Sequence, residues 1–174
     1  INESNASITN SSIDIELNLN NTDANVYVGA ICGENLGTIT GEHYNSENVL
    51  TGGFNYNNEF ADQVPNVTLN IINAKIGNPS EPQTISAGGA VGKNYSLVKK
   101  LKAEANVNGQ GSYSYLCGVA GGVVGENIGG VLSSVSGSLI SNKSLISGGS
   151  VVGKTISAGA LNELVAVMPN SFIA

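Results

Sequence analysis

The chain has 174 residues, a net charge of −6 and no arginine. Only 11% of its residues are charged, and no basic stripe is present that could neutralise phosphates, which argues against nucleic-acid binding. No apolar run approaches the ~20 residues that span a bilayer. We therefore expect neither a nucleic-acid partner nor a membrane span.

The composition favours short strands over helices. The chain holds 23 glycines and 41% apolar residues, mainly small aliphatics separated by Gly, Ser, Asn and Thr. This is enough apolar material to order the chain, and it suits short strands joined by tight turns. Glycine recurs too often for long helices. We predict an all-β protein.

Four stretches alternate between apolar and polar residues. In the first, residues 12–20, four aliphatic side chains alternate with acids and asparagines, which indicates a strand with one buried face. The same pattern recurs at 67–76, with a register break near Ile72, at 101–108 and at 134–139. Each of these predicted strands precedes a glycine-rich motif.

The glycine-rich motif occurs four times, at 29–39, 88–98, 121–131 and 149–159. The third copy reads GGVVGENIGGV. The first and fifth positions are always glycine: Gly29 and Gly33, Gly88 and Gly92, Gly121 and Gly125, Gly149 and Gly153. We expect each copy to form a corner, where glycine provides a positive φ or a close backbone approach, while the apolar residues between the glycines fill the interior.

Two slots after the fifth glycine are expected to stack. Asn35, Asn94 and Asn127 share one slot, with Thr155 in the fourth copy, and stacked asparagines can form a ladder of side-chain hydrogen bonds. The slot before it alternates in sign, because it holds Glu34, Lys93, Glu126 and Lys154. Neighbouring strands lie ~4.8 Å apart, so that alternating charges would attract weakly.

The spacing of the motifs predicts the organisation of the chain. The fifth-position glycines are 59, 33 and 28 residues apart. Intervals near thirty are typical of stacked repeats, so we predict a single β-solenoid (β-helix-like) domain over 1–174, with about four to five coils and units of about 30 residues. The expected units are about 7–40, 64–97, 98–131 and 132–162. The stretch 41–65 is interpreted as an insertion or a degenerate unit.

The motif resembles the GLUG motif, a glycine-rich repeat of bacterial surface proteins, large adhesins and the non-catalytic parts of some extracellular peptidases. The third copy is most similar, through Gly121, Gly122, Val124, Gly125, Asn127, Gly129 and Val131. The second copy has Ser96 in place of the later glycine, and the fourth lacks both the asparagine and that glycine. The resemblance implies an extracellular β-solenoid whose motif residues are structural and not catalytic.

The residues offer little for catalysis. His43 is the only histidine, and no nucleophile-elbow pattern accompanies it. One histidine and two cysteines do not make a zinc site. A polysaccharide-active β-helix enzyme is the weakest alternative, because a uronate-processing site would need a cation such as arginine. We expect no enzyme activity and no cofactor.

Calcium binding is left open, because carboxylates in polar loops are hard oxygen ligands, although they do not follow a known calcium-loop spacing. The acids in question are Asp14, Asp23, Glu42, Glu47, Glu59 and Asp62.

The two cysteines are expected to be buried thiols. Cys32 occupies the slot that valine holds in the other three copies. Cys117 precedes the third copy, so that stacking in order would place the two sulfurs too far apart for a disulfide. A disulfide between them is nevertheless left open.

One segment breaks the pattern and gathers aromatic residues. The insertion at 43–65 contains Tyr44, Phe54, Tyr56 and Phe60 among asparagines and acids. Such residues serve sugar or protein contacts, or they pack an insertion over the side of a sheet.

We predict a structural or adhesive segment of a bacterial surface protein or extracellular filament, acting as a spacer or stalk. The start at Ile1 without a signal-like segment is interpreted as part of a longer exported polypeptide. Expected partners are adjoining domains or copies of the same protein, because open sheet ends expose unpaired edges. The alternative is a module that binds a host or surface glycan or protein through the insertion.

Overall fold

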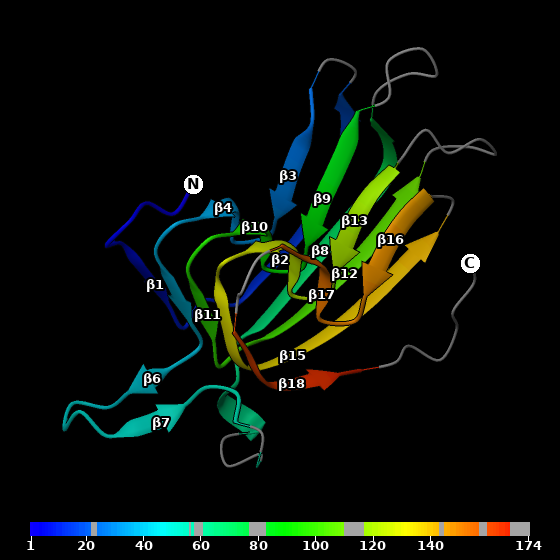
Figure 1. Cartoon of the computed structure of the whole chain (residues 1–174). Coiled ribbons are helices and arrows are strands. Elements are labelled where there is room, and N and C mark those ends of the chain that lie inside the picture. Colours follow the sequence, from blue (N-terminus) through cyan, green and yellow to red (C-terminus); the bar gives the residue numbers. More distant parts are fainter. Residues whose placement is uncertain are drawn as a thin grey trace.

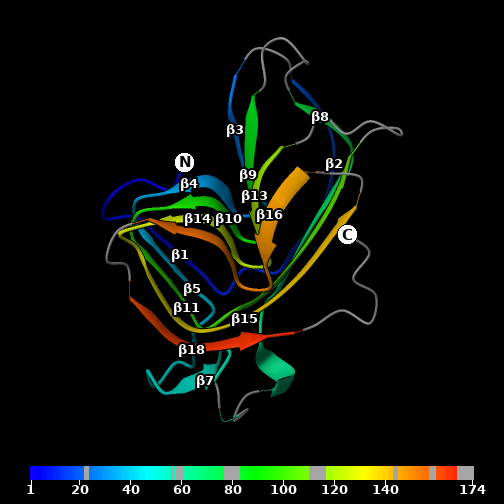
Figure 2. The same cartoon turned by 45° about the vertical axis from the view of Figure 1, so that its right-hand side comes forward.

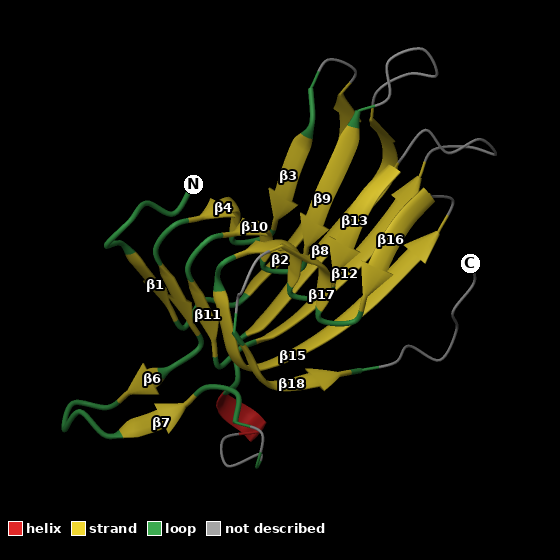
Figure 3. Ribbon diagram, in the orientation of Figure 1, coloured by secondary structure: helices red, strands yellow, loops and turns green. Residues whose placement is uncertain are grey.

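A computed structural model describes residues 1–21, 24–55, 57, 61–76, 83–109, 117–142, 145–156 and 160–167. Apart from one short 3-10 helix, η1 (Ala61–Gln63), all regular elements in these ranges are strands, which confirms the all-β prediction (Figure 3). The first nine strands are β1 (Ser7–Thr9), β2 (Ile13–Asn21), β3 (Val26–Gly29), β4 (Cys32–Asn35), β5 (Thr38–Thr40), β6 (His43–Tyr44), β7 (Leu50–Gly52), β8 (Asn66–Ile76) and β9 (Thr84–Gly88). The others are β10 (Val91–Asn94), β11 (Leu97–Lys99), β12 (Lys102–Gly109), β13 (Cys117–Gly121), β14 (Val124–Ile128), β15 (Val131–Asn142), β16 (Leu145–Gly149), β17 (Val152–Ile156) and β18 (Leu161–Ala166).

Three parallel sheets surround the interior (Figures 1 and 2). The long sheet has the order β1-β5-β11-β15-β12-β8-β2, with β18 also paired to β15. The β3 sheet contains β3, β9, β13 and β16, and the β4 sheet contains β4, β10, β14 and β17. The chain passes from the long sheet through the β3 sheet and the β4 sheet and back to the long sheet four times.

The pairing aligns the four motif copies. In the β4 sheet, Val91 pairs with Cys32 on one side and with Val124 on the other, and Val124 pairs with Val152. In the β3 sheet, the first glycines of the four copies pair in the same way. Equal positions in the motif therefore occupy equal positions in the sheets.

The alternating stretches form the long strands, as predicted. Val67, Leu69 and Ile71 of β8 are fully buried, whereas the side chains between them are only partly buried. The register break expected near Ile72 is present, since β8 carries one residue more than β12 between Ile71 and Ala74. Asn73 lies within this bulge at φ 51, a conformation that asparagine tolerates better than most residues.

The core has two parts. One is packed between the β4 sheet and the neighbouring part of the long sheet and contains Ile39, Val91, Val98 and Leu132. The other lies between the β3 sheet and the far part of the long sheet. Between them the motif corner touches the long sheet: a Cβ built on Gly122 would lie only 2.4 Å from the nitrogen of Ser138.

The long sheet bends at a corner where non-glycine residues adopt the left-handed backbone conformation, with positive φ. Lys100, Ser134 and Glu163 have φ of 55°, 50° and 52°, and the register of the adjacent strands places them at equivalent positions. Asn10, at φ 46°, is the equivalent residue after β1. A left-handed residue other than glycine costs roughly 1–2 kcal/mol, so packing must hold this bend in place.

The insertion starts at this corner. After β5, Gly41 donates its backbone N–H to Lys99, and Phe54 later donates its own to Lys100. Between them β6 and β7 form an antiparallel hairpin that does not join the parallel sheets (Figure 1). In the described part of 41–65, the chain thus makes an excursion from the corner and contributes no strand to the three parallel sheets.

No helix in the described ranges is long and apolar enough to cross a membrane.

Candidate functional site

The motif glycines lie where the outer faces of the β3 and β4 sheets meet. A Cβ on Gly88 would lie 2.0 Å from the oxygen of Val91, and a Cβ on Gly92 would lie 2.5 Å from the nitrogen of Val28. None of the first and fifth glycines has a positive φ. Of the two roles expected for them, close backbone approach is therefore the one observed. The space that a ligand loop would need is filled by backbone.

The predicted asparagine ladder is present. Asn35 donates its side-chain amide to Asn94 Oδ1 at 2.8 Å, and Asn94 donates to Asn127 Oδ1 at 2.9 Å. Asn2, which sequence analysis did not assign to the ladder, extends it by donating to Asn35 Oδ1 at 2.8 Å. Asn35, Asn94 and Asn127 are fully buried. The three side-chain amides also donate to backbone carbonyls, Asn35 to Leu97, Asn94 to Ser96 and Asn127 to Gly130. Asn94 Oδ1 in addition accepts the backbone N–H of Ser96.

The alternating charges lie in one row on the outer face of the β4 sheet. Lys93 pairs in register with Glu34 and Glu126, and Glu126 pairs with Lys154. The Nζ atoms of Lys93 and Lys154 lie 4.0 Å and 3.9 Å from the carboxylate of Glu126. The predicted row is therefore present, with contacts at the long end of the ion-pair range.

Two tyrosines flank Lys93. Its Nζ lies 4.6 Å from the ring centre of Tyr27 and 5.4 Å from that of Tyr95. A hydrogen bond to Tyr95 raises the pKa of Lys93, and a hydrogen bond to Tyr27 adds to this effect, while burial opposes it. The lysine is therefore protonated over the physiological range. The tyrosine faces that would attract another cation are thus already used by this chain.

The described aromatic residues of the insertion differ in solvent exposure. Tyr44 is 46% exposed, whereas Phe54 is only 6% exposed, with Lys102 Nζ 5.8 Å from its ring centre. The Phe54 side chain is therefore buried and is not available to a partner. Tyr56 and Phe60 lie outside the described residues.

A groove lies between the base of the hairpin and the outer face of the long sheet, and we call it the hairpin groove. Its floor carries four hydroxyls, because Ser7 pairs with Thr38 and Thr9 pairs with Thr40 in the parallel strands β1 and β5. Its volume is about 440 Å³. The other residues that line it are Asn10, Glu42, His43, Tyr44 and Lys99.

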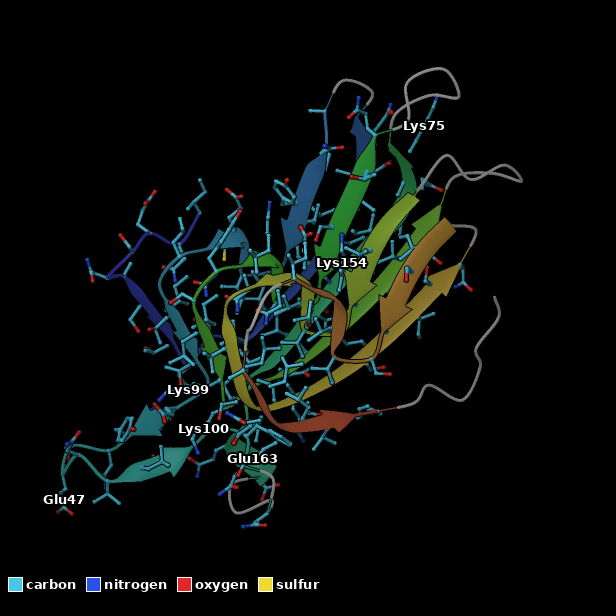
Figure 4. All side chains as sticks on the ribbon, viewed as in Figure 1. Glu47, Lys75, Lys99, Lys100, Lys154 and Glu163 are labelled. Carbon is cyan, nitrogen blue, oxygen red and sulfur yellow. The ribbon has the colours of Figure 1, made fainter. Side chains whose placement is uncertain are left out.

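Polar contacts fix the walls of this groove. Lys99 Nζ lies 2.8 Å from Glu42 Oε2, which ties the start of the hairpin to β11. The Asn10 amide nitrogen lies 3.0 Å from Nδ1 of His43 and ties the hairpin to the corner after β1. A second hollow of about 330 Å³ shares Asn10 and His43 with the groove and is also lined by Ser12 and residues 62–65. Figure 4 shows Lys99 at the hairpin base and Glu47 at its tip.

The hairpin is ordered by its own turn. The Asn45 side chain accepts hydrogen bonds from the backbone N–H groups of Glu47 and Val49, and Asn48 adopts φ 60°. This local closure holds Tyr44 at the margin of the groove. The groove is not predictable from the insertion alone, because its floor comes from β1 and β5, which do not belong to the insertion.

Two features of the described residues bear on reactivity: the grouping of metal-ligand side chains and the thiol of Cys32. No group of three or more His, Cys, Asp or Glu in these ranges could hold a metal ion. Cys32 is a free, buried thiol, as expected, and burial raises its pKa to about 11, so that it is a poor nucleophile at neutral pH. The side chain of Cys117 lies outside the described residues.

No family model, curated protein or solved structure matches the chain. The resemblance to GLUG repeats thus remains a prediction.

Proposed function

We propose that the chain is a β-solenoid that serves as a structural segment of an extracellular bacterial surface protein or filament. The observation that carries this proposal is the alignment of the motif copies, in which Asn35, Asn94 and Asn127 form one buried ladder. An array of this kind is stabilised mainly between neighbouring units, so that its length can change by whole units. This property suits a spacer or stalk, and the GLUG resemblance supports the location at the cell surface.

Partners are proposed at the ends of the stack. Strands β2 and β3 occupy one edge of their sheets, and β16 and β17 occupy an edge at the opposite end. An edge strand offers unpaired backbone groups to another strand. Near the second end, Ile156 and Leu161 are 36% and 42% exposed. Adjoining domains or copies of the same protein would cover these groups.

Deleting one unit tests the spacer role. Removing residues 98–131 joins Leu97 to Leu132, and the register is kept because Val98 pairs with Leu132. The deletion would bring Lys93 next to Lys154, so it is combined with Lys154→Glu. We expect a folded, shorter protein with cooperative unfolding, measured by circular dichroism. The control deletion 98–130 shifts the register of the following strand by one residue. This protein should be much less stable than the 98–131 deletion, because such a shift exchanges the buried and exposed faces of the strand.

A chain that cannot lose a unit would overturn the spacer role, provided that Lys154→Glu alone folds. The gene on either side of this segment gives a second test, because a stalk should carry further copies of the motif at about 30-residue spacing.

A second function, binding through the insertion, is favoured by the hairpin groove. Residues 42–52 can be removed by joining Gly41 to Gly53, because a Cβ on Gly53 would lie only 3.0 Å from the oxygen of Gly41. Beads coated with the wild-type protein should adhere to host cells or glycan surfaces, and beads coated with the folded deletion variant should not. Equal adherence of the two proteins would exclude the insertion as a binding site.

A further inference from the structure

We propose that the hairpin groove binds a neutral oligosaccharide. This inference rests on the binding function proposed for the insertion and names the class of ligand. It is carried by the hydroxyl floor, the charge balance of the walls and the exposed tyrosine at the margin.

The floor is a regular array of hydroxyls. The two in-register pairs, Ser7 with Thr38 and Thr9 with Thr40, are alternate residues on parallel strands. Strand geometry sets such positions about 4.8 Å apart between strands and roughly 6.6 Å apart along a strand. The Thr40 side chain is buried and its hydroxyl already accepts the backbone N–H of Glu42, so Ser7, Thr9 and Thr38 are the hydroxyls most available to a ligand. Because hydroxyls both donate and accept hydrogen bonds, they can pair with the hydroxyls around a sugar ring.

The charges in the groove select a neutral ligand. Lys99 is the only cationic residue that lines it among the described residues, and it is already paired with Glu42 at 2.8 Å. The second hollow adds the carboxylate of Asp62. An acidic polysaccharide would therefore meet no free cation here, and the net charge of −6 would repel it. The carboxylates can instead accept hydrogen bonds from sugar hydroxyls.

The apolar content of the groove is small and local. Tyr44 is 46% exposed at its margin, and an aromatic face packs against the C–H face of a sugar ring. Among the described residues, no aliphatic side chain lines the hairpin groove, and the second hollow has only Val64 and Pro65. Protein partners usually need a larger apolar anchor, so that the lining favours a sugar over a protein.

The size of the site fits more than one sugar ring. The hollows of about 440 and about 330 Å³ are both lined by Asn10 and His43, which contact each other. Each is within the range of small-molecule sites, which is roughly 300–1,000 Å³. A linear oligosaccharide can lie along both hollows across this contact.

The test uses the whole chain with maltohexaose, cellohexaose, mannohexaose and N-acetylated chitohexaose, and with hexagalacturonate as the acidic counterpart. Saturation-transfer NMR detects binding, and calorimetry measures affinity. We expect at least one neutral hexasaccharide to bind and hexagalacturonate not to bind. Tyr44→Ala should weaken binding about fivefold, the equivalent of ~1 kcal/mol. Thr9→Val, which keeps the shape but removes a hydroxyl, should also weaken it.

Tyr95→Ala is the matched control, since Tyr95 is 37% exposed and follows β10 on a different sheet. Its affinity for the sugar should equal that of the wild type. Binding that Tyr44→Ala and Thr9→Val leave unchanged would overturn the proposal, as would preference for hexagalacturonate. Failure of all four neutral sugars would also overturn it. If the protein still adheres to cells in that case, and loses adherence when 42–52 is deleted, only the sugar assignment fails and the binding function stands.

Discussion

Asn94 donates its side-chain amide to Oδ1 of Asn127 at 2.9 Å, and neither side chain is exposed to solvent. The same Asn94 accepts the amide of Asn35 at 2.8 Å. A single side chain therefore joins three successive strands of the β4 sheet. A buried amide of this kind is stabilising only while its partners are present, because an unsatisfied buried polar group costs about 1–3 kcal/mol.

Replacing this central amide should weaken the whole stack. Asn94→Ala leaves Asn35 without its side-chain acceptor and Asn127 without its donor. We expect the free energy of unfolding to fall by about 2–4 kcal/mol, measured by urea denaturation. Asn18→Ala, at an exposed position on β2, is the control and should change it by less than about 0.5 kcal/mol. Similar values for the two variants would mean that the ladder does not stabilise the fold.

Two glycine substitutions separate close approach from backbone conformation. In Gly92→Ala the new Cβ would lie 2.5 Å from the nitrogen of Val28, at a φ that is not positive. In Gly129→Ala there is space around the Cβ, but φ is 67°. We expect Gly92→Ala to cost more than about 2 kcal/mol and Gly129→Ala about 1 kcal/mol, by thermal or urea unfolding. The reverse order would show that conformation, and not contact between the sheets, requires the motif glycine.

The row of charges on the β4 sheet should contribute little, and in a salt-dependent way. Glu126→Lys places three lysines in succession where Lys93 and Lys154 now face one carboxylate. We expect a loss of about 1 kcal/mol or less, and a smaller loss for Glu126→Gln. The difference between the two variants should nearly vanish at about 1 M salt, where the screening length is ~3 Å. A difference that persists in high salt would point to packing instead of charge.

The thiol of Cys32 should make stability depend on alkaline pH. Burial raises its pKa from 9.0 to about 11, with smaller opposing effects of the N-terminal charge and of a hydrogen bond from Asn2. The folded protein thus keeps this proton to higher pH than the unfolded chain does. The resulting stability is fully present below about pH 9 and is lost as the pH rises toward about 11.

The measurement compares urea unfolding of Cys117→Ser and of Cys32→Val/Cys117→Ser across this range. Ionisation of lysines and tyrosines is common to both proteins and cancels in the difference. The protein that retains Cys32 should lose more stability between pH 9 and pH 11. Parallel pH profiles would show that the thiol is not protected in the folded state.

Local patterns were sufficient to predict the long strands and the position of the ladder. Alternation over 12–20 predicts one buried face without knowledge of what covers it, because side chains on a strand alternate between faces. The shared slot of Asn35, Asn94 and Asn127 predicts stacking because equal spacing brings equal residues together. Asn2 was not assigned to the ladder, since it belongs to no copy of the motif.

The left-handed corner could not be predicted in the same way. Lys100, Ser134 and Glu163 are residue types that rarely adopt a positive φ. The bend exists because Val98 before it and Leu101 and Ala103 after it all pack into the same part of the core. Tertiary packing thus overrides local preference at these positions.

The insertion shows the same division between sequence and tertiary structure. The sequence by itself determined that 43–65 lies outside the pattern and that its aromatics differ from the small aliphatics elsewhere. Only the tertiary structure decided that Phe54 is buried, that Tyr44 is exposed and that β1 and β5 supply the floor beneath the hairpin. The physical reason is that periodicity is a property of neighbours along the chain. A groove instead depends on contacts such as that of Asn10 with His43, which join residues 33 positions apart.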